Sequence, residues 1–189
     1  MKLRDWMLAD HADARDRFER GVAGRVPLER WTEHPDGGGS TIAWLVLHQT
    51  YHQDLAIRTA VRDRPPLLQE RRGPLGLDGF APTAGLSESE DPDVVAALDL
   101  DALVAYAADV HAETHAWLGT VAMMALDTVT DASARIERVG VTAADVGWLH
   151  AMWDGKPVNW FVRWEAIGHG HTHVGEMVSL RNRMGLSPF

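Results

Sequence analysis

The sequence predicts an all-α protein, a four-helix bundle with a long crossover between its second and third helices. Four segments carry apolar residues at helical spacing, and strand-like alternation is weak throughout. A Pro- and Gly-rich stretch from Arg64 to Pro92 is too long for a hairpin turn, so we expect it to cross the bundle. A length of 189 residues suits one domain, and we expect residues 1–189 to form a single unit.

The first two helices have clear start and stop signals. The first is expected from about Leu3 to Arg20, with Gly21 as its stop. The second follows a run of three glycines, where Ser40 or Thr41 could cap it, and continues to about Arg62. The apolar stripe of the first helix consists of Leu3, Met7, Ala14 and Phe18. The stripe of the second consists of Trp44, His48, Tyr51 and Leu55.

The third helix is expected from about Leu100 to Leu126, with Leu103, Ala107, Val110, Thr114, Trp117 and Val121 in register. The fourth runs from about Asn159 to Met184 and is closed by Gly185. The connection from Thr128 to Lys156 is expected to hold short helical turns. We expect Trp6, Trp44, Trp117 and Trp164 in the core, while Trp148, Trp153 and Trp160 either wall a pocket or pack a loop.

Composition excludes several classes of protein. A net charge of -9 argues against nucleic acid as a partner. The absence of cysteine excludes disulfides, protein thiolate nucleophiles and cysteine-ligated zinc, so His, Asp or Glu must hold any metal. The N-terminal residues lack the apolar region of a secretory signal, and the longest uncharged run, Gly37 to Gln53, is typical of a buried helix. We therefore expect a cytoplasmic protein without a membrane partner.

The histidines form i,i+4 pairs more often than chance predicts. Ten histidines in this chain would give about half such a pair, and the sequence has three. Residues at this spacing stand one above the other on a helix and can share a metal ion. The pairs are His48 with His52, His111 with His115, and His169 with His173.

Helical geometry separates the histidines by the face that they occupy. On the fourth helix, His169 and His173 fall on the buried stripe between Glu165 and Glu176, whereas His171 should point outward. Buried polar groups need partners, which a metal ion or a hydrogen-bonded core network would provide.

On the second helix His48 lies near the centre of the apolar stripe, where it could face the pair on the fourth helix. His52 lies at the edge, as a pocket residue or a fourth ligand, and Tyr51 and Trp44 are further pocket candidates. His111 and His115 should lie at the boundary or in solvent. His11 lies on the inward stripe without a paired neighbour, so we expect it to be structural.

Two segments carry a resemblance to a known family. The segments GGGSTIAWLVLHQTYHQDLAI and HGHTHVGEMVSLRNRMGLS, in the second and fourth helices, resemble the DinB-like (YfiT-like) superfamily, and the likeness extends over nearly the whole chain. It implies a four-helix bundle, often a homodimer, in which His48, His169 and His173 bind a divalent metal, zinc or nickel. The additional His52 departs from the family pattern and leaves the coordination number open.

The resemblance implies a thiol S-transferase or thiol-dependent isomerase that uses mycothiol, bacillithiol or glutathione. The partners would then be a small-molecule thiol and an electrophile. Because the chain has no cysteine, the thiol would come as a cosubstrate, and Glu165 or Glu176 could orient an imidazole or act as a base. A non-catalytic or stress-associated metal-binding protein, a metal-dependent hydrolase and a plain bundle with a histidine-rich core remain alternatives.

Overall fold

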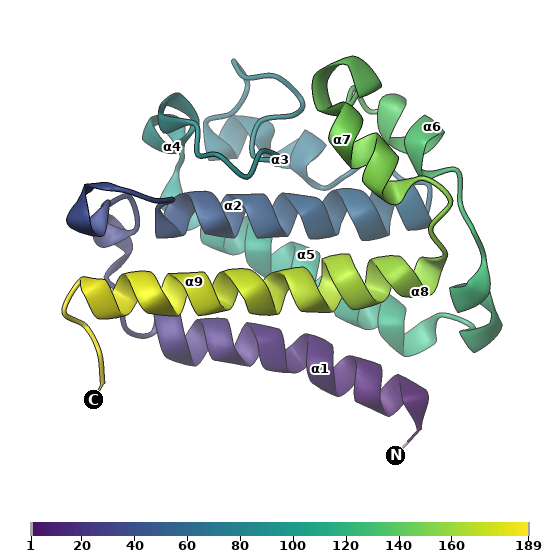
Figure 1. The fold of residues 1–189 in the computed structure, drawn as a ribbon, viewed down its shortest axis with the longest axis horizontal. Coiled ribbons are helices and arrows are strands. Elements are labelled where there is room, and N and C mark those ends of the chain that lie inside the picture. The colour runs from purple at the N-terminus through teal and green to yellow at the C-terminus, as the bar shows by residue number, and fades with distance from the viewer. Residues whose placement is uncertain (1, 189) are drawn as a thin grey trace.

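Four long helices lie side by side and form a bundle in the computed structural model, which describes residues 2–188 (Figure 1). They are α1 (Leu3–Phe18), α2 (Ile42–Gln53), α5 (Leu100–Thr120) and α9 (His169–Arg183). Helix α9 packs against both α1 and α2, and α5 packs against the same two helices from the other side. Within residues 2–188 the only β-pairing is an isolated bridge between Val129 and Pro157, so the predicted all-α bundle is confirmed.

Three of the long helices are extended by π-helical segments. These are η1 (Glu19–Ala23) after α1, η4 (Asp54–Val61) after α2, and η6 (Val162–Gly168), which joins α8 (Val158–Phe161) to α9. The predicted stop at Gly21 is therefore wrong. A Cβ atom at Gly21 would lie 3.4 Å from Val178 Cγ2, so this glycine permits close packing on α9 instead of ending the helix.

The third helix ends earlier than predicted, at Thr120 instead of Leu126. The Thr120 hydroxyl donates to the Trp117 carbonyl at 3.1 Å, and Val121 leaves the helical conformation. A 3-10 turn, η5 (Met123–Asp127), follows and still buries Leu126. At the start of α2, Thr41 is the cap, because its hydroxyl accepts from the Trp44 N–H at 3.1 Å.

The two long connections carry short helices, and both lie on the α2 side of the bundle (Figure 1). The crossover holds α3 (Leu68–Leu75) and leads into α4 (Pro92–Ala97). The second connection holds α6 (Ala132–Glu137) and α7 (Ala143–Trp153), as predicted for this stretch. Two further 3-10 turns, η2 (Leu28–Arg30) and η3 (Pro35–Gly37), lead into α2.

Most of the predicted core is buried, with exceptions at one end of the bundle. Leu3, Trp6 and Trp164 are 59%, 42% and 44% exposed, so their placement in the core was wrong. These side chains lie in the first turns of α1 and of η6, on surface that the described residues leave exposed. Among the described residues, no helix combines the length and the apolarity needed to cross a membrane.

Candidate metal centre

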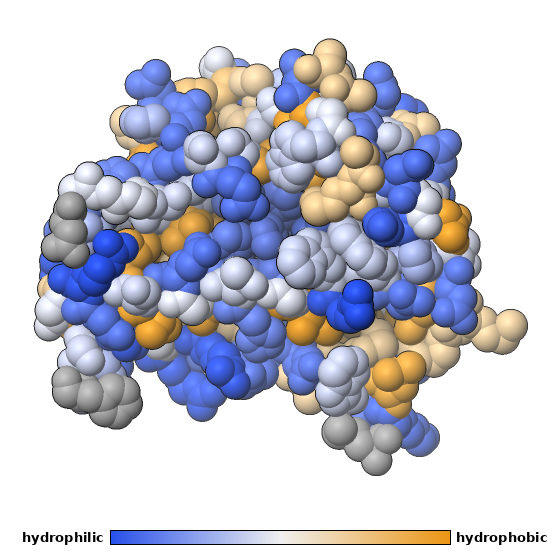
Figure 2. Space-filling model, viewed as in Figure 1, coloured by the Kyte–Doolittle hydropathy of each residue, from blue (hydrophilic) through white to orange (hydrophobic). Residues whose placement is uncertain are grey.

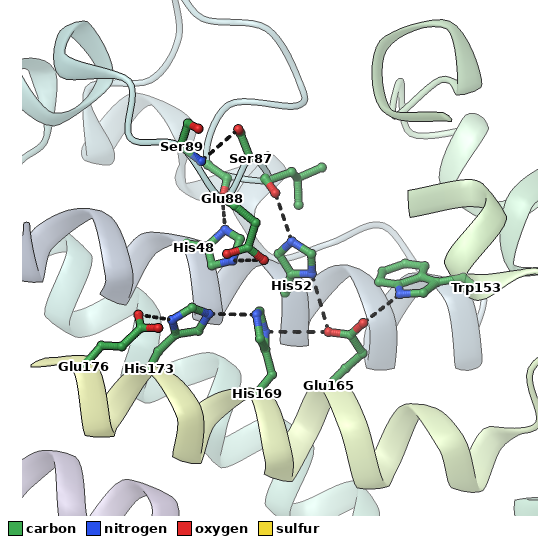
Figure 3. A network of polar contacts seen from close by, with 12 residues as sticks. His48, His52, Ser87, Glu88, Ser89, Trp153, Glu165, His169, His173 and Glu176 are labelled. Carbon is green, nitrogen blue, oxygen red and sulfur yellow. Dashed lines mark hydrogen bonds and ion pairs between the residues drawn. The ribbon is translucent and has the colours of Figure 1, made fainter. Parts of the chain in front are cut away.

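Three buried imidazoles from two helices meet between α2 and α9 (Figure 3). His48 comes from α2, and His169 and His173 come from successive turns of α9. One nitrogen from each lies within 4.8 Å of the other two, and all three side chains are buried. The His48 ring stands at 70° and 89° to the two rings of α9, so the three imidazoles surround a common point.

The Nδ1 atom of each imidazole faces the oxygen of a backbone carbonyl or of an ionised carboxylate. Such an oxygen accepts hydrogen bonds and cannot donate them. His48 Nδ1 donates to the Gly85 carbonyl at 2.9 Å, and His173 Nδ1 donates to Glu176 Oε2 at 2.9 Å. His169 Nδ1 lies 3.7 Å from Glu165 Oε2. Because the Gly85 carbonyl and the Glu176 carboxylate hold the proton on Nδ1, the Nε2 atoms of His48 and His173 keep their lone pairs. His169 Nδ1 has no hydrogen-bond partner within residues 2–188.

Two of the three Nε2 atoms face each other, and the third has no hydrogen-bond partner among the described residues. His48 Nε2 is buried and has no hydrogen-bond partner within residues 2–188. The Nε2 atoms of His169 and His173 lie 2.8 Å apart, closer than two lone pairs approach unless a proton or a cation lies between them. Imidazole nitrogen is a preferred ligand of divalent transition metals, so these residues fit such an ion.

Burial also sets the protonation state that metal binding needs. Burial and the neighbouring imidazoles of His52 and His173 lower the pKa of His48 to about 3. Burial, and to a lesser degree the neighbouring imidazoles, lowers the pKa of His169 far below its ordinary value. Both side chains are therefore neutral at neutral pH, as a ligating imidazole must be.

His52 and Glu165 form a second polar group one turn further along. Glu165 is buried and accepts from Trp153 Nε1 at 2.7 Å, while its other oxygen lies 3.4 Å from His52 Nδ1. His52 Nε2 lies 3.1 Å from the Leu86 carbonyl, so it is placed to donate there. His52, Glu165 and His169 could together hold a cation, and ligation by His52 therefore stays a prediction.

The crossover contributes groups that sequence reasoning did not identify. The carbonyl oxygens of Gly85 and Leu86 lie within hydrogen-bond distance of the two histidines of α2. Glu88 Oε1 lies 3.7 Å from His48 Nε2 (Figure 3). A backbone carbonyl leaves no side-chain signal in a sequence. Glu88 lies in an irregular loop, where helical periodicity gives no facing direction.

An open cleft of about 350 Å³ between α2 and α9 reaches two of the three imidazoles, those of His48 and His173. Its apolar wall comes from Trp44, Leu45 and Leu180, and its polar groups include Ser40 and Glu88. Figure 2 shows the surface hollowed between α2 and α9, with polar residues in the middle of the hollow. Trp44 Nε1 is buried without a hydrogen-bond partner in the described chain, so the wall also offers a donor.

The other candidate residues take varied positions. Glu176 was predicted to face inward, but its side chain is 51% exposed, because its stripe faces the open cleft at this point instead of a filled core. Tyr51 donates to the Pro82 carbonyl at 2.7 Å and lines a different cavity. His171 is half-buried against α1, away from the three imidazoles, as predicted. Trp148 stacks on His52.

Comparison with known proteins agrees with the fold. A family model described as the DinB superfamily matches residues 11–177. A crystal structure of a "conserved protein of locus from Enterococcus faecalis" has a TM-score of 0.68 and 22% sequence identity, and covers 98% of this chain and 99% of that chain. At this identity the likeness concerns the fold alone. Comparison with curated proteins found no match.

Proposed function

The chain belongs to the DinB superfamily, and from the imidazoles at the base of its cleft we propose that it is a metal-dependent enzyme of low-molecular-weight thiols. The reaction would be S-transfer or a thiol-dependent isomerisation, with mycothiol, bacillithiol or glutathione as cosubstrate. One observation supports the proposal: three buried imidazoles converge, and two of them, His48 and His173, line an open cleft of about 350 Å³. A purely structural metal site is usually closed by a fourth protein ligand, whereas a catalytic site keeps a position open.

The Nε2 atoms of His48, His169 and His173 would hold the ion, and zinc or nickel suits three imidazoles. A divalent cation at this point would supply Lewis acidity, which lowers the pKa of a coordinated thiol towards neutrality. Glu176 would orient His173 through its bond to Nδ1, and the buried Glu165 would do the same for His169. Glu165 lies behind His169 and away from the cleft lining, so we assign it no base role.

Glu88 is placed to act on the thiol. Its carboxylate is exposed, lines the cleft and lies 3.7 Å from His48 Nε2. In the proposed step, Glu88 accepts the thiol proton, the sulfur forms a bond to an electrophilic carbon, and the leaving group departs with the electron pair of its own bond. In an isomerisation the sulfur would add and later depart, so the thiol would be recovered. The apolar wall of Trp44, Leu45 and Leu180 would receive the carbon skeleton of the electrophile.

The test is a conjugation assay with zinc- or nickel-loaded protein. Each of the three thiols would be combined with an activated aryl halide and with an α,β-unsaturated carbonyl compound. We expect conjugation with at least one thiol, loss of conjugation in His173→Ala, and a decrease of about 100-fold in kcat for Glu88→Gln with the metal content unchanged. Glu70→Gln, an exposed carboxylate on α3, is the matched control.

Absence of conjugation with all three thiols would contradict the transferase. Turnover of generic esters or amides under the same conditions would identify a metal-dependent hydrolase instead. A metal-loaded protein that is inactive in both assays would favour the non-catalytic, stress-associated alternative.

We also propose that the protein is a homodimer. Several large apolar side chains are exposed near the start of α1 and along η6, among them Leu3, Trp6 and Trp164. A second copy of the chain would cover such a surface. Light scattering should give twice the chain mass of 20.9 kDa, and a monomer at high protein concentration would contradict the dimer.

A further inference from the structure

A second group of three histidines lies on the opposite side of α2 from the candidate metal centre. His11 comes from α1, and His111 and His115 come from successive turns of α5. One nitrogen from each lies within 4.8 Å of the other two. His11 is only 1% exposed, as expected for the inward stripe, and His111 and His115 lie at the boundary. The sequence did not indicate that the three would meet. We infer that these three residues form a second site for a divalent transition-metal cation.

The distance between the two most closely placed nitrogens supports this inference. His11 Nδ1 and His115 Nδ1 lie 3.4 Å apart, which is longer than an ordinary hydrogen bond between nitrogens. Two nitrogens that bind one tetrahedral zinc ion, each at 2.0–2.1 Å, stand about 3.3–3.4 Å apart. The distance between the two Nδ1 atoms therefore matches that of two ligands of one ion. As a hydrogen bond it would be weak at best.

The surroundings offer the groups that a ligated ion needs. Gln49 and Gln53 project from α2 on the side opposite to His48 and His52, and the Gln53 amide lies 3.1 Å from His11 Nε2. With its oxygen turned towards His11, this amide would accept a hydrogen bond from Nε2 and leave the lone pair of Nδ1 for the ion. A small cavity of about 40 Å³ adjoins His11, His111 and Gln49 and has room for a water molecule or an ion. Gln49 Oε1 is buried without a hydrogen-bond partner among the described residues, so it could serve as a further ligand or receive a bound water.

Charge and ring geometry are compatible with a cation here. Arg15 lines the same cavity and would oppose a cation, but it is paired with Glu19, and Asp16 acts on His111 in the opposite sense. The His111 ring stacks on His11 at 4.2 Å, so ligation requires it to turn out of the stack. His111 is half-buried, so its ring has room to rotate away from His11.

Protonation favours ligation as well. Burial, followed by the two neighbouring imidazoles, lowers the pKa of His11 to about 3, and burial with Arg15 lowers that of His111 to about 4. Both are neutral at neutral pH and offer lone pairs. The cavity is too small for a substrate, so the ion would tie α1 to α5 and stabilise the bundle without taking part in catalysis.

The test measures bound zinc in tag-free protein, with the first site removed. The variant His48→Ala/His169→Ala serves as the background, because His169 belongs to both possible ligand groups of the first site. Zinc is determined by elemental analysis after equilibrium dialysis against free zinc. We expect about two ions per chain in the wild type, one in the background and none when His115→Ala is added. Zinc should also raise the melting temperature of the background but not that of the variant with His115→Ala.

The matched control is His171→Ala in the same background, which should keep its single ion because His171 belongs to neither group. A background that binds no zinc would overturn the second site, and so would a background whose ion survives His115→Ala. Circular dichroism checks that each variant folds. If the background is unfolded, the wild type is compared with the single variant His115→Gln, because His115 is half-buried and tolerates the exchange. An unchanged count of two ions in this variant would again overturn the site.

Discussion

At the scale of single residues, the metal centre depends on which nitrogen of each imidazole carries the proton. The Gly85 carbonyl and the Glu176 carboxylate hold the proton on Nδ1 of His48 and His173. This leaves a lone pair on Nε2 of each ring, and Nε2 of His173 faces Nε2 of His169 at 2.8 Å. An acceptor on the outer nitrogen also fixes the angle of the ring and increases the basicity of the ligating nitrogen.

Removal of one such acceptor should weaken metal binding without unfolding the protein. Glu176 is 51% exposed, so Glu176→Ala creates no cavity in the core. We expect the Kd for zinc at the first site to rise about 10–100-fold, because His173 loses the group that orients it. Glu176→Gln keeps an oxygen acceptor and should lose less. Competition with a chromophoric chelator measures both constants, and an equal Kd in wild type and Glu176→Ala would contradict the role of Glu176.

The direction of each α9 histidine could be predicted from the sequence, because 100° per residue separates His171 from His169 and His173. The exposure of Glu176 could not, because it depends on whether a neighbouring element covers the stripe. The same limit applies to His11, His111 and His115. Their convergence requires the packing of α1 on α5, which no local pattern on either helix contains.

At the scale of elements, the crossover has a direct part in the site. Residues around Gly85 pass over α2 and supply the carbonyl acceptors of its two histidines. Gly85 adopts a φ of 96°, a conformation that favours glycine, and a Cβ atom there would lie 3.0 Å from Leu47 Cγ. The position therefore needs glycine both for its backbone conformation and for its closeness to α2.

We expect Gly85→Ala to destabilise the fold by about 1–3 kcal/mol, the usual cost of a strained backbone conformation. It should also weaken zinc binding, because the carbonyl that holds His48 would move. Gly79→Ala is the matched control: it lies in the same crossover, and a Cβ atom there would have no neighbour within 4 Å among the described residues. Chemical denaturation and a zinc titration give the two quantities, and equal behaviour of both variants would refute the requirement at Gly85.

Asp54 fastens the start of α3 to the second long helix. Its carboxylate accepts from the N–H groups of Leu67 and Leu68 at 3.0 and 2.9 Å and from the Tyr106 hydroxyl at 2.9 Å. Burial nevertheless raises the pKa of Asp54 from 3.8 to about 6. Between about pH 4 and pH 6 the folded protein therefore keeps a proton that the unfolded chain has released, and the free energy of unfolding falls as pH rises through this window.

Comparison with Asp54→Asn, which does not titrate, isolates this contribution. The difference in the free energy of unfolding between wild type and variant should fall by about 2 kcal/mol from pH 4 to pH 6, since the slope approaches about 1.4 kcal/mol per pH unit only between the two pKa values. Urea denaturation across this range measures the difference. A difference that is independent of pH would show that Asp54 is ionised with its ordinary pKa.

The long helices could be predicted because their apolar stripes repeat over many turns. Their π-helical segments and the early end of α5 could not. In η1 the glycine that resembles a stop instead lies against Val178 of α9, and in α5 the helix ends where the Thr120 hydroxyl donates to a carbonyl of its own last turn. Both outcomes depend on tertiary packing or on a side-chain bond that competes with the backbone.

At the scale of the whole molecule, α2 separates two polar centres in one bundle. His48 and His52 face the residues of η6 and α9, and His48 also lines the open cleft, whereas Gln49 and Gln53 face His11 and the small cavity. The first centre has access for a substrate and the second does not. The bundle therefore provides a site suited to chemistry and, by our inference, a site suited to cross-linking its helices.

The most direct test of the first site is a crystal structure of the zinc-loaded protein with anomalous data collected on both sides of the zinc absorption edge. We predict an anomalous peak about 2.0–2.1 Å from Nε2 of His48, His169 and His173, with no involvement of His171. Absence of a peak between these three nitrogens, or a peak ligated by His171 in their place, would contradict the account.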